Sequence, residues 1–124
     1  MPDKVIDASV MAAWCFREGR RREALEAMSG SELCAPTLLA YELANIAWKK
    51  AQGNPEGMDN LRQGLEEALA LPIRWLGVDH VAVWRIALDS NLSAYDASYL
   101  YLARILGAPL VTFDQRLQRA ARGY

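Results

Sequence analysis

The sequence is poor in the residues that bind zinc or form disulfide bonds. It has one histidine, His80, and two cysteines, Cys15 and Cys34, which lie far apart. A zinc site needs three or four such ligands, usually at short and regular spacings, so the composition argues against one. No secretory segment precedes the cysteines, and we therefore expect them to be reduced, buried residues of a cytoplasmic protein.

Long apolar stretches and phosphate-binding loops are also missing. No apolar run reaches the ~18 residues of a membrane-spanning helix, and residues 1–4 are too few for a targeting segment. There is no Gly-rich phosphate loop, no Gly-x-Gly-x-x-Gly motif and no Ser–His–acid set. We expect no membrane partner, and any chemistry has to come from other residue types.

Neither sign of charge dominates, because 14 Lys and Arg face 15 Asp and Glu for a net charge of −1. This balance argues against a protein that coats nucleic acid, but clustered catalytic acids can cancel basic patches in the sum. Arginines cluster early, among residues 17–22, and late, among residues 116–122. They form either a solvated face or phosphate contacts with nucleic acid. The candidates for such contacts are Arg20, Arg21, Arg116 and Arg119.

The length predicts one domain, residues 1–124, and hydrophobic residues make up 52% of it, enough for a globular core. Short apolar runs alternate with longer amphipathic ones. The predicted strands are 4–7, 33–35, 73–76 and 110–113, and the predicted helices are 10–16, 20–28, 37–52, 58–71, 80–89, 93–106 and 115–122. This alternation is typical of an α/β fold, a three-layer α/β/α sandwich with a central parallel sheet.

Four acids occupy matching places in this pattern. Asp7 and Asp114 end the first and last strands, Asp96 lies at the start of a helix, and Glu42 lies about one turn into another. The carboxyl ends of parallel strands share one edge of a sheet, and the helices that follow begin there. The four carboxylates are therefore expected to converge.

Each acid also has an interpretation without chemistry. Asp96 and Asp114 could cap helices, and Glu42 could be an ordinary surface charge. Converged carboxylates repel, however, by about 4 kcal/mol for two unit charges 4 Å apart at an effective dielectric of 20. Such a cluster takes up protons or binds a cation. Oxygen ligands without histidine or thiolate favour Mg²⁺ or Mn²⁺, which activate water in phosphate-ester chemistry.

The segments around these acids resemble the PIN domain and, more narrowly, the VapC toxins of bacterial and archaeal toxin–antitoxin pairs. They are VIDAS at residues 5–9, PTLLAYELAN at 36–45, LSAYDASYLYLA at 92–103 and VTFD at 111–114. Each motif alone is loose, but all four occur in order over almost the whole chain. The resemblance implies a Mg²⁺- or Mn²⁺-dependent endoribonuclease that hydrolyses RNA phosphodiester bonds with a metal-activated water.

The resemblance also implies roles for single residues and partners. Asp7, Glu42, Asp96 and Asp114 match the family's catalytic, metal-binding positions, and Ser9 and Thr112 match hydroxyl positions beside them. The alternative for these hydroxyls is a helix N-cap at Ser9 and an ordinary strand residue at Thr112. The family further implies a homodimer and a cognate VapB-type antitoxin that wraps the toxin of a type II pair.

Two other functions stay open. One is a catalytically silent PIN-like binding or scaffold module, although such a module has no reason to keep a repelling acid cluster. The other is a metal-dependent DNA or flap nuclease, whose larger relatives carry extra acids and helices. The chain also stops at Tyr124 where relatives continue into a final edge strand, so that strand is either short here or truncated.

Aromatic residues at helical spacing are usually core residues. This is our interpretation of Trp14, Phe16 and Trp48, although the resemblance places the apolar segment of an antitoxin in this region. For Tyr95, Tyr99 and Tyr101 we favour core or interface packing over stacking on a base.

Overall fold

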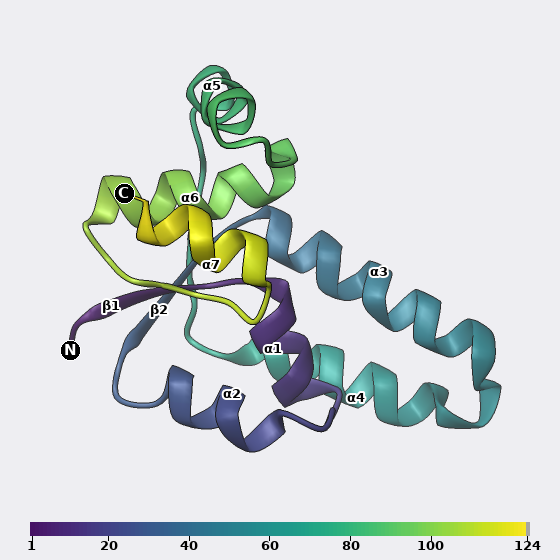
Figure 1. Cartoon of the computed structure of the whole chain (residues 1–124). Coiled ribbons are helices and arrows are strands. Elements are labelled where there is room, and N and C mark those ends of the chain that lie inside the picture. Colours follow the sequence, from purple (N-terminus) through teal and green to yellow (C-terminus); the bar gives the residue numbers. More distant parts are fainter. Residues whose placement is uncertain (124) are drawn as a thin grey trace.

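A four-stranded parallel sheet in the order β3-β2-β1-β4 lies at the centre of the computed structural model, which describes residues 1–123 (Figure 1). The strands are β1 Asp3–Ile6, β2 Glu32–Pro36, β3 Arg74–Leu76 and β4 Leu110–Val111. Val5 pairs with Cys34 of β2 on one side and with Leu110 of β4 on the other. The predicted parallel sheet is confirmed, and β3 and β4 are its two edge strands among the described residues. Tyr124, where the sequence raised the question of a further strand, lies outside them.

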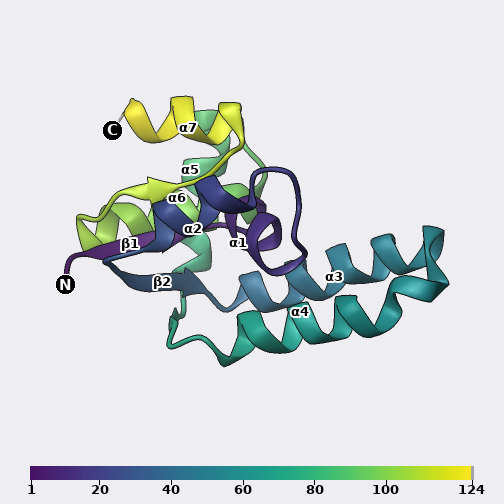
Figure 2. The ribbon, with the colours of Figure 1, turned by 90° about the horizontal axis from the view of Figure 1, so that it is seen from below.

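Helices flank this sheet, as predicted for an α/β fold. They are α1 Ala8–Cys15, α2 Arg21–Met28, α3 Leu38–Gly53, α4 Met58–Ala70, α5 His80–Ser90, α6 Ala94–Leu106 and α7 Gln115–Arg122, with a 3-10 turn η1 Pro55–Gly57. Helix α6 packs on β1 and β2, and α5 packs on α6. Helices α3 and α4 run side by side as a hairpin that extends away from the sheet (Figure 2). Between residues 1 and 123, no helix has both the length and the apolar character to cross a membrane.

The predicted helix at 10–16 begins earlier than expected. Its N-cap is Asp7, whose carboxylate accepts a hydrogen bond from the backbone N–H of Val10, and not Ser9. Ser9 lies inside the helix and donates its hydroxyl proton to Asp7. The predicted last strand, 110–113, is also too long, because Thr112 and Phe113 leave the ladder and bond toward the start of α1. Both errors arise where side-chain hydrogen bonds of the site replace regular backbone pairing.

The core lies between the sheet and its helices. Its largest fully buried side chains are Tyr99, Ile6, Met11, Leu39, Leu43, Leu100, Leu102 and Leu117. Cys15 and Cys34 are free and buried in this core, as predicted, and burial raises the pKa of the Cys15 thiol to about 12. Of the three aromatics predicted to be core residues, Trp14 and Phe16 pack partly buried against the core. The prediction is wrong for Trp48, which is 59% exposed on the outer face of α3.

The packing of α4 against the end of α1 depends on a glycine. A Cβ at Gly64 would lie 2.3 Å from the carbonyl oxygen of Cys15, too close for the backbone to stay in place. Gly64→Ala is therefore expected to lower the free energy of unfolding by about 1–3 kcal/mol, measured by urea denaturation. In an open helical position the same change stabilises by up to about 1 kcal/mol. Gly53→Ala, with no atom within 4 Å, is the control, and equal stabilities would contradict this packing.

Candidate active site

Asp7 is the most buried of the four predicted acids, and only 6% of it is exposed. It follows β1 and caps α1. One carboxylate oxygen, Oδ1, accepts from the Ser9 hydroxyl at 2.7 Å and the Val10 N–H at 3.2 Å, and Oδ2 accepts from the Thr112 hydroxyl at 2.5 Å. Burial raises the pKa of Asp7, and these hydrogen bonds offset part of that rise.

The two hydroxyls join the start of α1 to the loop before α7. The oxygen of Ser9 accepts from the N–H of Phe113 at 2.9 Å, and that of Thr112 accepts from the N–H of Asp114 at 3.0 Å. Each hydroxyl therefore donates to Asp7 and makes one bond between segments more than a hundred residues apart along the chain: Ser9 accepts from Phe113, and Thr112 donates to Asp7. Ser9 and Thr112 lie beside the acids, where the resemblance placed them, and they fix the orientation of the Asp7 carboxylate.

Glu42 approaches the same edge of the sheet from α3. Its Oε1 accepts a hydrogen bond from the hydroxyl of Tyr99 on α6 at 2.5 Å. Partial burial raises the pKa of Glu42, and the negative charges of Asp96 and Asp7 raise it further. Glu42 is thus an electrostatic neighbour of two other acids rather than an isolated surface charge.

Asp96 and Asp114 complete the group. Asp96 lies in the first turn of α6, where Ser93 is the N-cap and accepts from its backbone N–H. Burial raises the pKa of Asp96, the charge of Asp114 raises it further, and Arg116 lowers it. Asp114 caps α7 by accepting from the N–H of Leu117 at 3.0 Å. The predicted capping role of Asp114 is confirmed. Asp114 is still close enough to Asp96 for its charge to raise the pKa of that residue.

The structure therefore brings all four predicted acids to one edge of the sheet. The charges of Asp7 and Asp96 act on Glu42, and the charge of Asp114 acts on Asp96. Within residues 1–123, no three acidic, histidine or cysteine side chains stand close enough together to hold a metal ion as they are placed. The donor set nevertheless suits Mg²⁺ or Mn²⁺, because it offers only carboxylate and hydroxyl oxygens. Burial raises the pKa values of three of the acids, so a divalent cation beside them would stabilise their charged forms.

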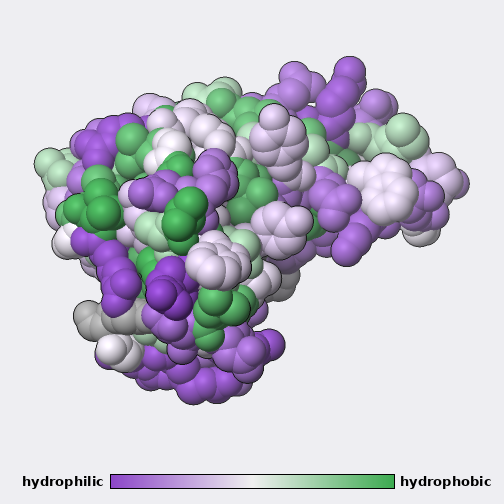
Figure 3. Space-filling model, turned by 90° about the horizontal axis from the view of Figure 1, so that it is seen from above, coloured by the Kyte–Doolittle hydropathy of each residue, from purple (hydrophilic) through white to green (hydrophobic). Residues whose placement is uncertain are grey.

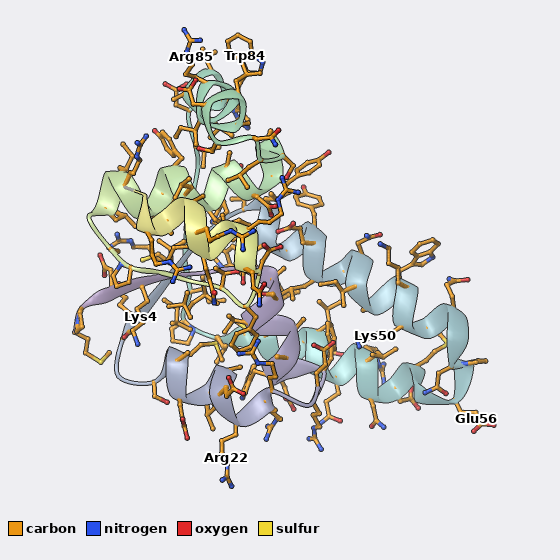
Figure 4. The ribbon with its side chains drawn as sticks, viewed as in Figure 1. Lys4, Arg22, Lys50, Glu56, Trp84 and Arg85 are labelled. Carbon is orange, nitrogen blue, oxygen red and sulfur yellow. The ribbon has the colours of Figure 1, made fainter. Side chains whose placement is uncertain are left out.

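A cleft of about 600 Å³ opens beside these acids. Ser9 and Phe113 line its end nearest Asp7, and Arg20, Lys49 and Lys50 lie along it. The Arg20 guanidinium stacks on the Phe113 ring, 3.7 Å from its centroid, and pairs with Glu23 at 2.7 Å. Lys50, on α3 (Figure 4), pairs with Glu18 at 2.7 Å. The lining is therefore largely apolar, and its charged members are three cations and the acid Glu18.

The other predicted arginines have different surroundings. Arg21 donates from Nε to the carbonyl oxygen of Trp14 at 3.2 Å, and Arg116 donates to the carbonyl oxygen of Asn91 at 2.8 Å. Arg119 is exposed on α7. Of the four predicted arginines, Arg20 lines the cleft, and the charge of Arg116 lowers the pKa of Asp96.

Two residues of the site escaped the sequence analysis. We predicted only packing or stacking for Tyr99, although its position three residues after Asp96 places both on one face of α6. Lys49 was passed over because it is only one of a pair of lysines on α3, and the fold places it in the lining of the same cleft as Arg20. Among the other tyrosines, Tyr95 is 64% exposed and Tyr101 is partly buried against the core.

Comparison with known proteins agrees with this geometry. The PIN domain family model matches residues 4–123. Ribonuclease VapC3 of Pyrobaculum aerophilum is 35% identical over 118 residues, which span 91% of this chain and 90% of that protein. Ribonuclease VapC9 of Mycobacterium tuberculosis is 35% identical over 115 residues, 91% of this chain and 87% of that protein. A relative from P. aerophilum named exonuclease VapC9 is 31% identical over 69% of this chain and 65% of its own length.

Solved structures share the fold. The crystal structure of PAE2754 from P. aerophilum superposes with a TM-score of 0.79 and 28% identity, covering 98% of this chain and 81% of that one. M. tuberculosis VapC20, described as a Sarcin-Ricin loop cleaving toxin, superposes with a TM-score of 0.69 at 16% identity over 94% of each chain. The second likeness concerns the fold alone. With the family model matching nearly the whole chain, and relatives named VapC at 35% identity, this protein belongs to the PIN-domain family, among its VapC members.

Proposed function

We propose that this protein is a Mg²⁺- or Mn²⁺-dependent endoribonuclease and the toxin of a type II toxin–antitoxin pair. The observation that carries the proposal is the convergence of Asp7, Glu42, Asp96 and Asp114, three of which have raised pKa values. Relatives named ribonucleases support RNA as the substrate. We assign the four acids as the catalytic, metal-binding set.

The metal-binding acids and the neighbouring hydroxyls have different roles in this proposal. A bound Mg²⁺ or Mn²⁺ would supply an activated water and stabilise charge on the phosphate oxygens. The Ser9 and Thr112 hydroxyls hold the Asp7 carboxylate in one orientation. Its orientation is therefore already fixed before substrate binds. Among the described residues no Ser–His–acid set competes for the role of nucleophile, so the attacking oxygen comes from water.

The cleft beside Asp7 is our proposed path for RNA. Arg20 is held against Phe113, and a guanidinium stacked in this way still has donors for a phosphate. Lys49 lies beside it. Arg116, whose charge acts on Asp96, is a further candidate for phosphate contact, whereas Arg21 and Arg119 are weaker candidates because neither lines the cleft nor acts on one of the acids whose pKa is raised. The largely apolar lining of the same cleft and the exposed Trp48 suit the apolar segment of a VapB-type antitoxin.

We further propose a homodimer in the cytoplasm. Val81, Trp84 and Leu88 form an exposed apolar stripe along α5, with 74%, 57% and 57% of each residue exposed. Trp84 points outward from α5 in Figure 4, and the face that carries α5 mixes apolar with polar side chains in Figure 3. An apolar stripe of this kind on one helix supports association between copies. The two free, buried thiols support a reducing compartment.

Cleavage of a total cellular RNA pool tests the proposed function. The purified protein is expected to yield discrete fragments with Mg²⁺ or Mn²⁺ and none with EDTA, followed by sequencing of the new ends. Asp96→Asn should abolish the fragments. Asp79→Asn is the control, because Asp79 lies at the start of a helix, as Asp96 does, but is not among the charges that shift the pKa values of the other acids.

Other outcomes would select the alternatives. Progressive shortening from one end would make the protein an exonuclease, as the name of one relative suggests for that relative. Cleavage of DNA or flap substrates in place of RNA would make it a DNA nuclease. A folded wild type that binds Mn²⁺ but cuts neither nucleic acid would be a silent scaffold.

A further inference from the structure

Tyr99 is a buried core residue that carries one polar atom into the acid site. Only 1% of it is exposed, and its ring belongs to the main hydrophobic core with Leu39, Leu43 and Leu102. A phenylalanine would fill the same space without a hydroxyl that has to be satisfied. The hydroxyl is satisfied by Glu42, through the 2.5 Å hydrogen bond from α6 to α3.

This hydrogen bond connects Glu42 to the helix that carries Asp96, although the two acids are far apart in the sequence. Tyr99 lies one turn after Asp96 on α6, and Glu42 is on α3. Tyr99 is the donor in this bond, because a carboxylate oxygen such as Oε1 of Glu42 can only accept. The bond therefore occupies one oxygen of Glu42 and fixes a flexible side chain from inside the core.

We propose that Tyr99 is a positioning residue for Glu42, with its hydroxyl holding Oε1 so that the rest of the carboxylate is available to a divalent cation that would bind at the acids. This inference rests on the proposed function, which supplies the metal. A glutamate that is already ordered loses less rotamer freedom when it binds a cation. Groups that orient a metal ligand in this way typically contribute 10–100-fold to metal affinity or activity.

The test is the affinity for Mn²⁺ in the absence of RNA, measured by the electron paramagnetic resonance signal of free Mn²⁺. Tyr99→Phe is expected to weaken Mn²⁺ binding about 10-fold. The control is Tyr101→Phe, the same substitution on the same helix at a tyrosine that packs against the core and does not contribute to the pKa shifts of the acids. It should leave the affinity unchanged. With saturating metal, kcat of Tyr99→Phe should fall while KM for RNA stays the same.

A second variant separates positioning from packing. In a Glu42→Gln background, Tyr99→Phe should have little further effect on Mn²⁺ binding, because the hydroxyl acts through the carboxylate. Additive losses would overturn the proposal. So would a Tyr99→Phe protein with a lower melting temperature but wild-type Mn²⁺ affinity and kcat, since Tyr99 would then only pack the core. A folded wild type that neither binds Mn²⁺ nor cleaves RNA would overturn this inference and the proposed function together.

Discussion

Asp7→Asn is expected to lower RNA cleavage by at least about 10³-fold while leaving the protein folded, since loss of one member of a catalytic set costs about this much or more. Asparagine is as good an N-cap as aspartate, so its amide oxygen can keep the bonds to the Val10 N–H and the Ser9 hydroxyl. The charge needed to bind the metal is gone. The free energy of unfolding should stay the same or rise at neutral pH, because a buried charge is removed.

The measurement pairs an RNA cleavage assay with thermal unfolding of the same samples. Asp79→Asn, which changes a capping aspartate of α5 outside the acid group, should keep wild-type activity. Asp7→Ala is the contrasting variant, in which stability should fall as well as activity. It removes the N-cap of α1 and leaves the Ser9 and Thr112 hydroxyls without their acceptor. It is expected to cost about 1–2 kcal/mol of stability. If Asp7→Asn lost activity only by unfolding, Asp7 would be a structural cap and not a ligand.

Addition of Mn²⁺ is expected to raise the melting temperature at pH 7.5 by on the order of 10 °C once its concentration reaches about 100 times Kd, which corresponds to about 2.7 kcal/mol. Without metal, burial raises the pKa values of Asp7, Glu42 and Asp96 in the folded protein, and the charges of neighbouring acids raise those of Glu42 and Asp96 further. In the unfolded chain these groups return to about 4. The metal relieves a repulsion that exists only when the acids are ionised.

The sign of the pH dependence follows from linkage. Because the folded pKa values are above the unfolded ones, the contribution of these acids to stability is fully present below about pH 4. It is lost as the pH rises through the raised values. The metal-free protein should therefore lose stability from these groups toward neutral pH, and the Mn²⁺-induced rise should shrink at pH 5, where protons compete with the metal.

Asp96→Asn is the control for this pH dependence of stability. It removes one of the three raised groups and the repulsion between positions 96 and 114, so its stability should depend less on pH than that of the wild type. Its response to Mn²⁺ should also be much smaller. A wild-type melting temperature that Mn²⁺ does not change at pH 7.5 would contradict a metal site at these acids.

The order of the elements and the four candidate acids could be predicted from local patterns in the sequence. Runs of apolar residues predicted each strand, and local caps such as Ser93 and Asp114 predicted the starts of α6 and α7. Such signals are short-range, because a cap acts on a backbone N–H two or three residues away. Parallel topology then placed the ends of all strands at one edge, so convergence of the acids could be predicted without coordinates.

The hydrogen bonds that hold those acids could not be predicted in this way, because they form between segments that are distant in the sequence. Ser9 looked like an N-cap from its neighbours, but Thr112, more than a hundred residues away, joins it in fixing Asp7 as the cap. Tyr99 looked like a core or interface aromatic, and its partner Glu42 is on another helix. Hydrogen bonds and burial between distant segments leave no periodic trace in a sequence. They depend on atoms that meet only after the sheet has brought α1, α3, α6 and the loop before α7 together.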